Sequence, residues 1–238
     1  MPVAIITGAS KGLGRALAAE LAARGWDLVL DARSPEPLKL VADELRAAGA
    51  GRVEAVPGDV TDALHQGELV AAAERLGGGD LLVNNASALG AEPLVPLGEL
   101  PVAGLRAALE TNVVAPHALV RALLPQLRAA PRGGAVLNIS SDAAVEAYET
   151  WGGYGAAKAA LDHLSAVLAA EEPSLRVWAV DPGDMRTQLY AAAVPGDPDF
   201  EERLDPAEVA AAIATVVDAD VPSGRYTASA LGERGAGS

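Results

Sequence analysis

The sequence of 238 residues contains no cysteine, so disulfide bonds cannot hold the fold together. Its length is enough to bury a substantial core within one large domain over residues 1–238. The first apolar segment is short, lacks a basic leader and does not resemble a signal peptide. Together these absences favour a cytoplasmic protein.

Positive charge is scarce, because 18 lysines and arginines stand against 32 acidic residues and the formal net charge is −14. A surface of this sign repels nucleic acid and anionic membranes, which excludes both as partners. No uninterrupted apolar run is long enough to cross a bilayer. Even the long stretch from Pro101 to Ala130 is broken by Arg106, Glu110, Asn112, His117 and Arg121.

A metal-binding pattern is also missing. His65, His117 and His163 do not have the spacing of metal ligands. We expect ordinary surface or helix residues at these three positions and no metal in the protein.

What the chain does contain is a regular alternation of short apolar runs and longer helical segments. Strands are expected at Val3 to Ile6, Leu28 to Asp31, Val53 to Val56, Leu81 to Asn84, Ala135 to Ile139, Leu175 to Val180 and near Tyr226. Helices are expected from the first turn to about Arg24 and at Pro35 to Ala48, Ala63 to Leu76, Val102 to Ala129, Gly153 to Ala170 and Pro206 to Asp218. The glycine-rich tail from Gly232 is expected to be loose. This order predicts an α/β fold, a doubly wound parallel sheet with ligand sites at the carboxyl ends of its strands.

The first predicted strand runs into the turn Thr7-Gly8-Ala9-Ser10-Lys11-Gly12-Leu13-Gly14, which is followed by a helix. Glycines permit a tight turn and let a diphosphate approach the backbone, whose free N–H groups and helix dipole attract anions. Strand, turn and helix are the context that a dinucleotide fingerprint requires. The spacing is Gly-x-x-x-Gly-x-Gly rather than the more usual Gly-x-Gly-x-x-Gly.

Tyr154 and Lys158 are four residues apart in a predicted helix, so a phenol and an ammonium lie on one face. A phenol has an unperturbed pKa near ~10 and is a poor acid at neutral pH, but a nearby cation lowers that pKa toward the working range. The pair therefore predicts a proton donor with its own activating cation.

These motifs occur in a fixed order with Asp59-Val60, Asn84-Asn85-Ala86-Ser87, Asn112, Ser140-Ser141 and Pro182-Gly183. From Val3 to about Thr187 the series resembles the single-domain short-chain dehydrogenase/reductase family of the Tyr-x-x-x-Lys type. The resemblance implies a Rossmann-type sheet of about seven strands in the order 3-2-1-4-5-6-7. It also implies an NAD(P)-dependent enzyme that acts on CH–OH or carbonyl groups.

By the same resemblance, the catalytic residues are Asn112, Ser141, Tyr154 and Lys158. Ser141 is implied to bind the substrate oxygen and Tyr154 to donate a proton to it. Lys158 is implied to lower the tyrosine pKa and to bond the nicotinamide ribose. Ser140 competes with its neighbour for the serine role; because adjacent strand side chains point to opposite faces, only one can enter the site, and we choose Ser141.

For Asn112 the resemblance implies a backbone carbonyl that holds a water linking the lysine to solvent. Pro116, four residues later, has no N–H to donate and crowds that carbonyl, which leaves it without its helical partner. The alternative is that Pro116 only kinks the helix for packing, and both can hold.

The resemblance also implies the cofactor contacts. Asp59 matches an acid that hydrogen-bonds adenine, and Asn84 with Asn85 matches a pair that braces the sheet and touches the adenosine ribose. Asp59 and Asn84 are equally explained as helix caps. Ser87 departs from the usual glycine, and its small side chain is expected to be tolerated. The full predicted set is Gly8, Ser10, Lys11, Gly12, Leu13, Gly14, Arg33, Asp59, Val60, Asn85, Ala86, Tyr154, Lys158, Pro182, Gly183 and Thr187.

Cofactor preference depends on the end of the second strand. In the family register Ala32 occupies the position of the acid that selects NAD, and Arg33 that of a base that binds a 2′-phosphate. Asp31 lies one residue early and is expected to point away, while Lys11 adds a cation in the glycine turn. NADP(H) is therefore favoured over NAD(H). A one-residue slip would place Asp31 in the acid position and reverse this preference.

Aromatic residues make up only 3% of the chain. Most of them fall around the catalytic helix or in a predicted lid at about residues 187–205, namely Tyr148, Trp151, Tyr154, Tyr190 and Phe200. This bias predicts an apolar, ring-containing substrate held by flat surfaces; the alternative is a lid that packs on itself.

Acidic residues are expected on loops at the same mouth, at Glu92, Asp142, Glu146, Glu149 and Asp184. Such a rim disfavours anionic substrates and accepts neutral or cationic ones. The expected activity is therefore NADP(H)-dependent reduction of a ketone or aldehyde in a small, non-anionic molecule, for instance an amine-bearing or polycyclic one.

Two alternatives share parts of this pattern. A 3-oxoacyl-(acyl-carrier-protein) reductase has the same catalytic motifs, and Arg121, Arg128 and Arg132 would give it a basic docking patch. A non-enzymatic NADP-sensing protein would be expected to have lost the catalytic tyrosine and lysine, but both are present. In either case, alanine and leucine on several faces of the long and catalytic helices indicate a homodimer or homotetramer.

Overall fold

The computed structural model describes residues 1–219 and 221–236. Across these residues one parallel sheet has seven strands in the order β3-β2-β1-β4-β5-β6-β7. The strands are β1 (Val3–Ile6), β2 (Asp27–Ala32), β3 (Val53–Pro57), β4 (Leu81–Asn84), β5 (Ala135–Ile139), β6 (Arg176–Asp181) and β7 (Gly224–Thr227). The predicted fold class and strand order are confirmed.

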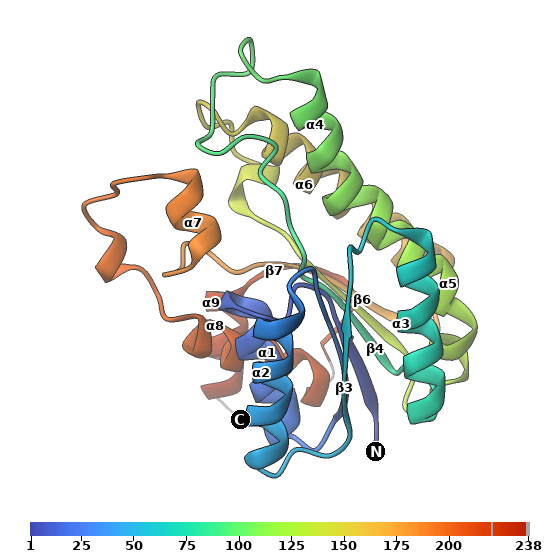
Figure 1. Cartoon of the computed structure of the whole chain (residues 1–238). Helices are drawn as coiled ribbons and strands as arrows, with labels where there is room; N and C mark the ends of the chain where they lie inside the picture. The colour runs from blue at the N-terminus through green and yellow to red at the C-terminus, as the bar shows by residue number, and fades with distance from the viewer. Residues whose placement is uncertain (220, 237–238) are drawn as a thin grey trace.

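Helices cover both faces of the sheet (Figure 1). One face carries α1 (Gly12–Ala23), α2 (Pro35–Ala47), α8 (Pro206–Asp218) and α9 (Ala228–Ala236). The other carries α3 (Ala63–Leu76), α5 (Ala115–Ala129) and α6 (Gly152–Glu171). Two further helices, α4 (Val102–Leu109) and α7 (Gln188–Ala193), lie beyond the carboxyl ends of the strands (Figure 1).

Alternate residues of the central strands enter two separate hydrophobic cores. Ala4 and Ile6 of β1 pack with α1, α2 and α8, whereas Val3 and Ile5 pack with α3 and α5. Successive side chains of a strand point to opposite faces, so a strand that is apolar throughout has to be covered on both. This explains why β1, β4 and β5, which are buried along their whole length, lie inside the sheet.

A buried polar chain fixes α6 against the sheet. Asn84 Nδ2 donates to Asn138 Oδ1 at 2.7 Å, linking β4 to β5. Asn138 Nδ2 donates to Ser165 Oγ at 2.8 Å, and that hydroxyl donates to the carbonyl of Leu161 at 2.7 Å. Hydrogen bonds between buried groups are costly to break, because each lost partner leaves an unsatisfied atom. The chain therefore sets the position of the helix that carries Tyr154 and Lys158.

Two expectations about helices are wrong. The helix expected from Val102 to Ala129 is interrupted by a π-helical turn, η1 (Glu110–Val114), centred on Asn112. Such a turn shifts the backbone pairing by one residue, which suits the missing N–H of Pro116. The tail expected to be loose from Gly232 is instead helical in α9 to Ala236, because Ala228 and Leu231 bury against the core that contains α8. Positions 237–238 of that tail lie outside the described residues.

Among the helices of the described residues, none combines the length and the apolar character needed to span a membrane.

Candidate functional site

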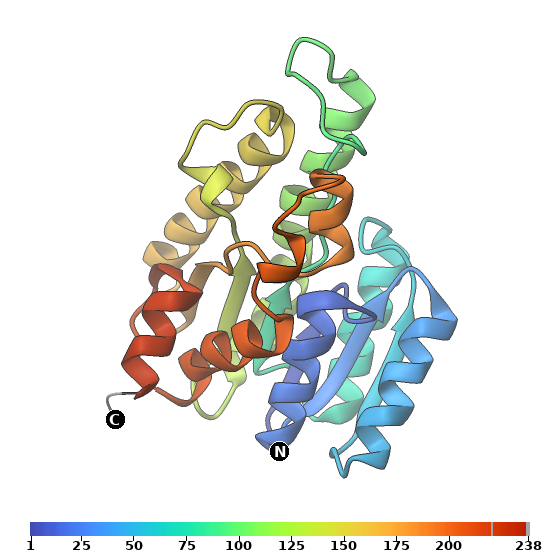
Figure 2. The same cartoon turned by 90° about the vertical axis from the view of Figure 1, so that its left-hand side faces the viewer.

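A cleft of about 540 Å³ opens at the carboxyl ends of the strands. Figure 2 shows α7 and the segment that follows it, in orange, above α1, in blue. The cleft is lined by all the predicted site residues except Gly14 and Asn112, which contact the lining from behind. The structure thus brings residues from six strand ends to one place.

The glycine turn has the shape needed for a diphosphate. Gly8 and Gly12 adopt left-handed backbone conformations, with φ of 67° and 54°. A Cβ on Gly8 would lie 3.0 Å from the Cα of Ala86, so the turn leaves no room for a side chain there. Lys11 precedes α1 without capping it through its side chain, which leaves the first N–H groups of the helix for a ligand. These residues fit a dinucleotide cofactor.

Thr7 and Asn85 brace this turn against β4. The Thr7 hydroxyl accepts hydrogen bonds from the backbone N–H groups of Asn85 and Ala86, both at 3.0 Å. The Asn85 amide donates to the carbonyls of Thr7 and Gly8 at 2.8 and 3.2 Å. The side chain of Asn85 therefore shapes the cofactor turn by holding the turn's backbone carbonyls. The family resemblance implied only that Asn85 helps to brace the sheet and touches the adenosine ribose.

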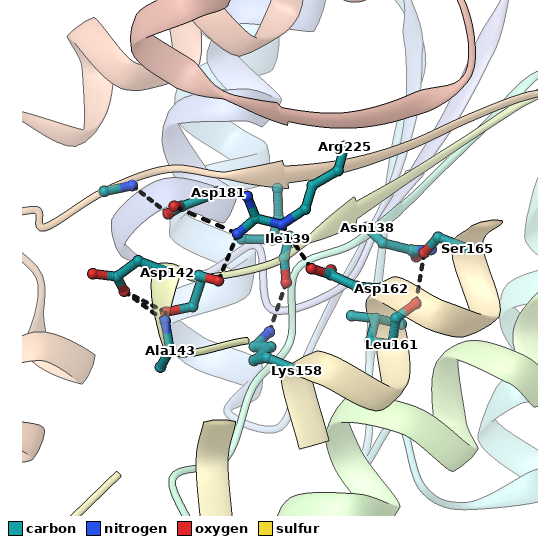
Figure 3. A network of polar contacts seen from close by, with 12 residues as sticks. Asn138, Ile139, Asp142, Ala143, Lys158, Leu161, Asp162, Ser165, Asp181 and Arg225 are labelled. Carbon is teal, nitrogen blue, oxygen red and sulfur yellow. Dashed lines mark hydrogen bonds and ion pairs between the residues drawn. The ribbon is translucent and has the colours of Figure 1, made fainter. Parts of the chain in front are cut away.

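Lys158 is buried with 1% of its surface exposed, and its ammonium donates to the carbonyl of Ile139 at 2.7 Å, at the end of β5 (Figure 3). The ammonium lies 5.5 Å from the centroid of the Tyr154 ring. Burial lowers the pKa of Lys158 to about 8, an effect that the carboxylate of Asp162 opposes. The amine is thus close to its titration point at physiological pH.

The pKa of Tyr154 differs from the expectation. Burial raises it to about 12, the hydroxyls of Ser87 and Ser141 oppose the rise, and the carboxylates of Asp142 and Asp181 add to it. The expected lowering by Lys158 is not among the principal causes, because that ammonium points to Ile139. Tyr154 is therefore a neutral phenol throughout the physiological range.

The two serines at the end of β5 have different surroundings. Ser141 lines the cleft and donates to Asp142 Oδ1 at 3.0 Å, and its oxygen accepts from the N–H of Ala143 at 3.2 Å. Ser140 also contributes to the lining, but it is 1% exposed and its hydroxyl has no hydrogen-bond partner among the described residues. The accessible hydroxyl near Tyr154 is that of Ser141.

Asn112 holds the loop after β4 with its side chain. Its amide oxygen accepts from Ser87 Oγ and from the N–H of Ala88, both at 3.0 Å, and its Nδ2 donates to the carbonyl of Ala88 at 2.8 Å. Ser87 is accommodated because its hydroxyl satisfies this amide. The expected water on the Asn112 carbonyl stays a prediction.

Arg225 of β7 is a site residue that sequence reasoning missed. Its Nη2 donates to the carbonyl of Ser141 at 2.9 Å, and its Nε donates to Asp162 at 2.8 Å (Figure 3). The same guanidinium lies 3.8 Å from Asp181, whose other oxygen accepts from the N–H of Gly183. One cation therefore joins the serine strand, the catalytic helix and the Pro182-Gly183 turn. No local motif surrounds Arg225, so the sequence carried no signal for it.

The adenosine end of the cleft departs from the expectation at two positions. Asp31 does not point away, since it lines the cleft and accepts from the N–H of Gly8 at 3.3 Å. His65 is not an ordinary helix residue, because its ring is buried and its Nε2 lies 2.6 Å from Asp31 Oδ1. Lys11 donates to Gln188 at 2.8 Å, and Asp59 accepts from the N–H and hydroxyl of Thr61. Asp59 thus forms a local turn while lining the cleft, and the capping alternative is wrong for it, because the residue that caps α3 is Asp62.

The aromatic and acidic expectations hold only in part. Tyr148, Trp151 and Tyr190 line the cleft, whereas Phe200 stacks behind Tyr190 with ring centroids 6.3 Å apart and is not part of the lining. Of the acidic residues expected at the mouth, the lining contains Asp142 and Asp184 but not Glu92, Glu146 or Glu149, and it also contains the unpredicted Asp181. The carboxylates of Asp142, Asp181 and Asp184 are offset in part by Arg225 and by Arg203, which lies 3.5 Å from Asp184. The rim is therefore less acidic than expected.

A family model described as short chain dehydrogenase matches residues 2–197. The protein belongs to this family. It is accordingly an oxidoreductase of a family that uses NAD(P) and acts on small molecules.

Relatives of known name support the same assignment. The chain is 36% identical over 214 residues to sepiapterin reductase of Meriones unguiculatus, covering 85% of this chain and 82% of that protein. It is 34% identical over 200 residues to an uncharacterised oxidoreductase of Mycobacterium tuberculosis, covering 82% and 73%.

Solved structures of this family have the same fold. An alcohol dehydrogenase from the archaeon Thermococcus sibiricus, complexed with 5-hydroxy-NADP, matches 95% of both chains at 31% identity with a TM-score of 0.86. A 7α-hydroxysteroid dehydrogenase complexed with NADH and 7-oxo glycochenodeoxycholic acid matches 95% of this chain and 92% of that one, at 28% identity and a TM-score of 0.85. The neighbours thus include complexes of both cofactor types.

Two glycines test the cofactor turn. A Cβ on Gly14 would overlap the Gly8 carbonyl oxygen and Asn85 Nδ2, whereas one on Gly67 in α3 meets nothing within 4 Å. Gly14→Ala is expected to displace the turn, to cost about 1–3 kcal/mol of stability and to weaken NAD(P)H binding roughly tenfold or more. Gly67→Ala, the matched control, should stabilise by about 0.5–1 kcal/mol and leave binding unchanged. Thermal denaturation and fluorescence titration measure both effects; unaltered affinity in Gly14→Ala would contradict the role of the turn.

Proposed function

We propose that the protein is an NADP(H)-dependent carbonyl reductase that converts a ketone or aldehyde to an alcohol. The observation that carries the proposal is the convergence of Ser141, Tyr154 and Lys158 on the cleft that also contains the glycine turn. A hydroxyl, a neutral phenol and a buried ammonium are the groups needed to hold a carbonyl oxygen and protonate it. When bound, the nicotinamide supplies the hydride.

Each side chain has a separate task in this proposal. Ser141 turns its hydroxyl from Asp142 to the substrate oxygen and orients it. Tyr154 donates its phenolic proton to that oxygen, for which a pKa of about 12 keeps it in the protonated form. Lys158 stabilises the phenolate that remains, because its ammonium lies on the same side of α6, 5.5 Å from the ring centroid. The backbone carbonyl of Asn112 is proposed to hold the expected water, through which protons pass from solvent to Lys158.

NADP(H) is proposed over NAD(H). Arg33 lines the cleft next to Ala32, is exposed, and makes no hydrogen bond or ion pair through its guanidinium with any residue of 1–219 or 221–236. A guanidinium in this position is available for a phosphate on the adenosine ribose. Lys11, held by Gln188, adds positive charge at the same end. The N–H groups of residues 10–14 are proposed to bind the pyrophosphate. Asp59, Val60 and Ala86, which line the cleft, are proposed to bind the adenine.

The substrate is proposed to be small, apolar or ring-containing, and not anionic. Trp151 packs edge-on against Tyr154 with ring centroids 5.6 Å apart, which places a flat apolar wall beside the proton donor. Tyr190 and Leu189 of α7 also line the cleft. The segment 187–205 is proposed as the lid. Its helix α7 lines the cleft, and Phe200, later in the same segment, stacks on Tyr190 without being part of the lining.

A 3-oxoacyl-(acyl-carrier-protein) reductase is the weaker alternative. It requires a basic docking patch, for which the sequence offered Arg121, Arg128 and Arg132. In the structure Arg128 is paired with Glu172 through two of its nitrogens, which removes most of its charge from the patch. A non-enzymatic NADP sensor is disfavoured because the tyrosine and lysine are both in the cleft.

A homodimer or homotetramer is proposed through the helices beside the cleft. Val102 and Val114 near the ends of α4 and η1 are 65% and 46% exposed, and Leu164 and Val167 of α6 are exposed as well. Large apolar side chains on neighbouring helices favour contact with a second copy. Light scattering of the purified protein measures this, and a monomer at micromolar concentration would refute it.

Tyr154→Phe tests the proton donor. The change removes one hydroxyl from a buried ring, so kcat is expected to fall by roughly 10²–10⁴ while NADPH affinity stays close to that of the wild type. Tyr148→Phe is the matched control, because its exposed hydroxyl donates only to Asp142 in the described structure and should affect kcat little. Steady-state rates on a panel of carbonyl compounds, with fluorescence titration of NADPH, measure both. A Tyr154→Phe protein that retains its turnover would exclude the mechanism.

The pH dependence tests the lysine. Burial lowers the pKa of Lys158 to about 8, so the amine is charged below that pH and neutral above it. The rate of reduction is therefore expected to be flat below pH ~8 and to decline about tenfold per unit above it, while Tyr154 remains protonated. Lys158→Arg stays charged throughout, so its profile, whatever its absolute rate, should lack this decline. An unbroken plateau to pH 10 in the wild type would show that the charge of Lys158 is not required.

Substrate charge tests the carboxylates of the lining. A cationic aryl ketone is expected to have a kcat/KM roughly threefold to tenfold above that of its anionic analogue at low salt, and the difference should shrink at high salt. Asp142 and Asp184 produce this field, with Arg203 and Arg225 limiting it. A preference for the anion would refute the proposed substrate class.

A further inference from the structure

The carboxylate of Asp31 occupies the adenosine end of the cofactor cleft. It follows Leu30 at the end of β2, is only 2% exposed, and accepts from the N–H of Gly8 in the glycine turn. The next two residues, Ala32 and Arg33, also line the cleft. An uncompensated negative charge at this place would oppose a phosphate on the adenosine ribose. Arg33 and Lys11 would then have to offset Asp31 before they could attract an anion.

His65 lies directly behind the wall of the cleft. It is on α3, and its ring packs under Gly58, where an added Cβ would come within 2.6 Å of the imidazole Cε1. Its Nε2 donates to Asp31 Oδ1 at 2.6 Å, and its Nδ1 lies 3.6 Å from Glu68 one turn further along the helix. The ring is 5% exposed, and its Nδ1 has no hydrogen-bond partner among the described residues, because the largely exposed Glu68 lies just beyond bonding distance. The contact with Asp31, and the charge of Glu68 at longer range, favour the imidazolium form.

The charges around this corner balance only with His65 included. At this end of the lining Asp31 and Asp59 contribute two negative charges, and Arg33 and Lys11 contribute two positive charges; behind the lining Glu68 adds one negative charge beside His65. Arg33 and His65 both act on Asp59, whose pKa is lowered mainly by its hydrogen bonds with Thr61. The hydrogen bond with Asp31 raises the pKa of His65, and burial raises that of Asp31 while His65 opposes it. A cationic imidazole brings the corner to neutrality, and its loss leaves a net charge of −1.

We propose that His65 determines cofactor specificity: its imidazolium neutralises Asp31 beneath the adenosine ribose and so permits a 2′-phosphate beside Arg33. This inference rests on the proposed NADP(H) preference and adds to it a residue that does not line the cleft. It also explains how an aspartate is tolerated at a position in contact with the phosphate-binding turn.

The test compares variants at the two residues of the pair. His65→Gln keeps a donor for Asp31 but removes the cation, so the ratio of the dissociation constants, Kd(NADH)/Kd(NADPH), is expected to fall roughly tenfold, the effect of one charge at short range. Asp31→Asn keeps the shape but removes the carboxylate that favours the imidazolium, so the proton can leave together with the negative charge and the same ratio should not fall. The double variant removes both charges, and its ratio should return to within about threefold of the wild type. Fluorescence titration of each reduced cofactor against the purified protein measures the ratios without a substrate.

The ratio of the two constants distinguishes charge from structure. A pair that only supports the fold would weaken both cofactors in parallel in either variant, and this result, or an unchanged ratio in His65→Gln, overturns the inference. If His65→Gln does not fold, Asp31→Asn decides, because a fall in its ratio also overturns it. His117→Gln, on the exposed side of α5, is the control and should leave both constants unchanged. A wild type that binds NADH more tightly would refute the proposed cofactor preference, whereas the response of the ratio to His65→Gln tests this inference separately.

Discussion

The hydrogen bond from the Lys158 ammonium to the carbonyl of Ile139 joins the catalytic helix to the end of a central strand. Few buried lysines have a neutral partner of this kind, and burial lowers the pKa of this one to about 8. Because the amine is tied to β5, Tyr154 one turn earlier on α6 is held above the same strand end as Ser141. Asn138 and Ser165 supply the second attachment between the two elements, so the helix can neither slide nor rotate away from the sheet. The geometry of the candidate site follows from these two attachments.

Carboxylates at strand ends form the second constraint. Asp31 is the penultimate residue of β2, Asp142 follows β5 and Asp181 ends β6, and all three line a cleft whose proposed ligand is itself an anion. Each has a dedicated partner: His65 for Asp31, Tyr148 for Asp142, and Arg225 with the N–H of Gly183 for Asp181. A protein with a net charge of −14 can hold a dinucleotide only if its local charges are compensated in this way. The partners, more than the carboxylates themselves, define which ligands the cleft admits.

Some elements follow directly from local sequence, and others depend on contacts that only the fold creates. The strands at Leu81–Asn84 and Ala135–Ile139 have the predicted bounds because each is an apolar run that ends abruptly in polar residues. The break at Asn112 was attributed to Pro116, but its form, a π-helical turn, depends on how the loop at Ala88 captures the asparagine amide. The last helix was missed because its glycines argue against it, whereas burial of Leu231 beside α8 supports it. Phe200 was placed in the pocket by proximity in sequence, yet Tyr190 stands between it and the cleft lining.

The sequence by itself determined the order of strands and helices, the glycine turn and the four-residue spacing of Tyr154 and Lys158, because these depend on neighbours within a few residues. Only the tertiary structure decided the charge and acidity of the site. The Asp31–His65 pair joins residues 34 positions apart, and Arg225 reaches the Ser141 carbonyl across 84. The pKa of Tyr154 is raised because the folded chain buries the phenol and brings Asp142 and Asp181 near it while Lys158 turns to Ile139. Electrostatic effects of this kind depend on distance and burial in the folded chain, which residue spacing along a sequence does not specify.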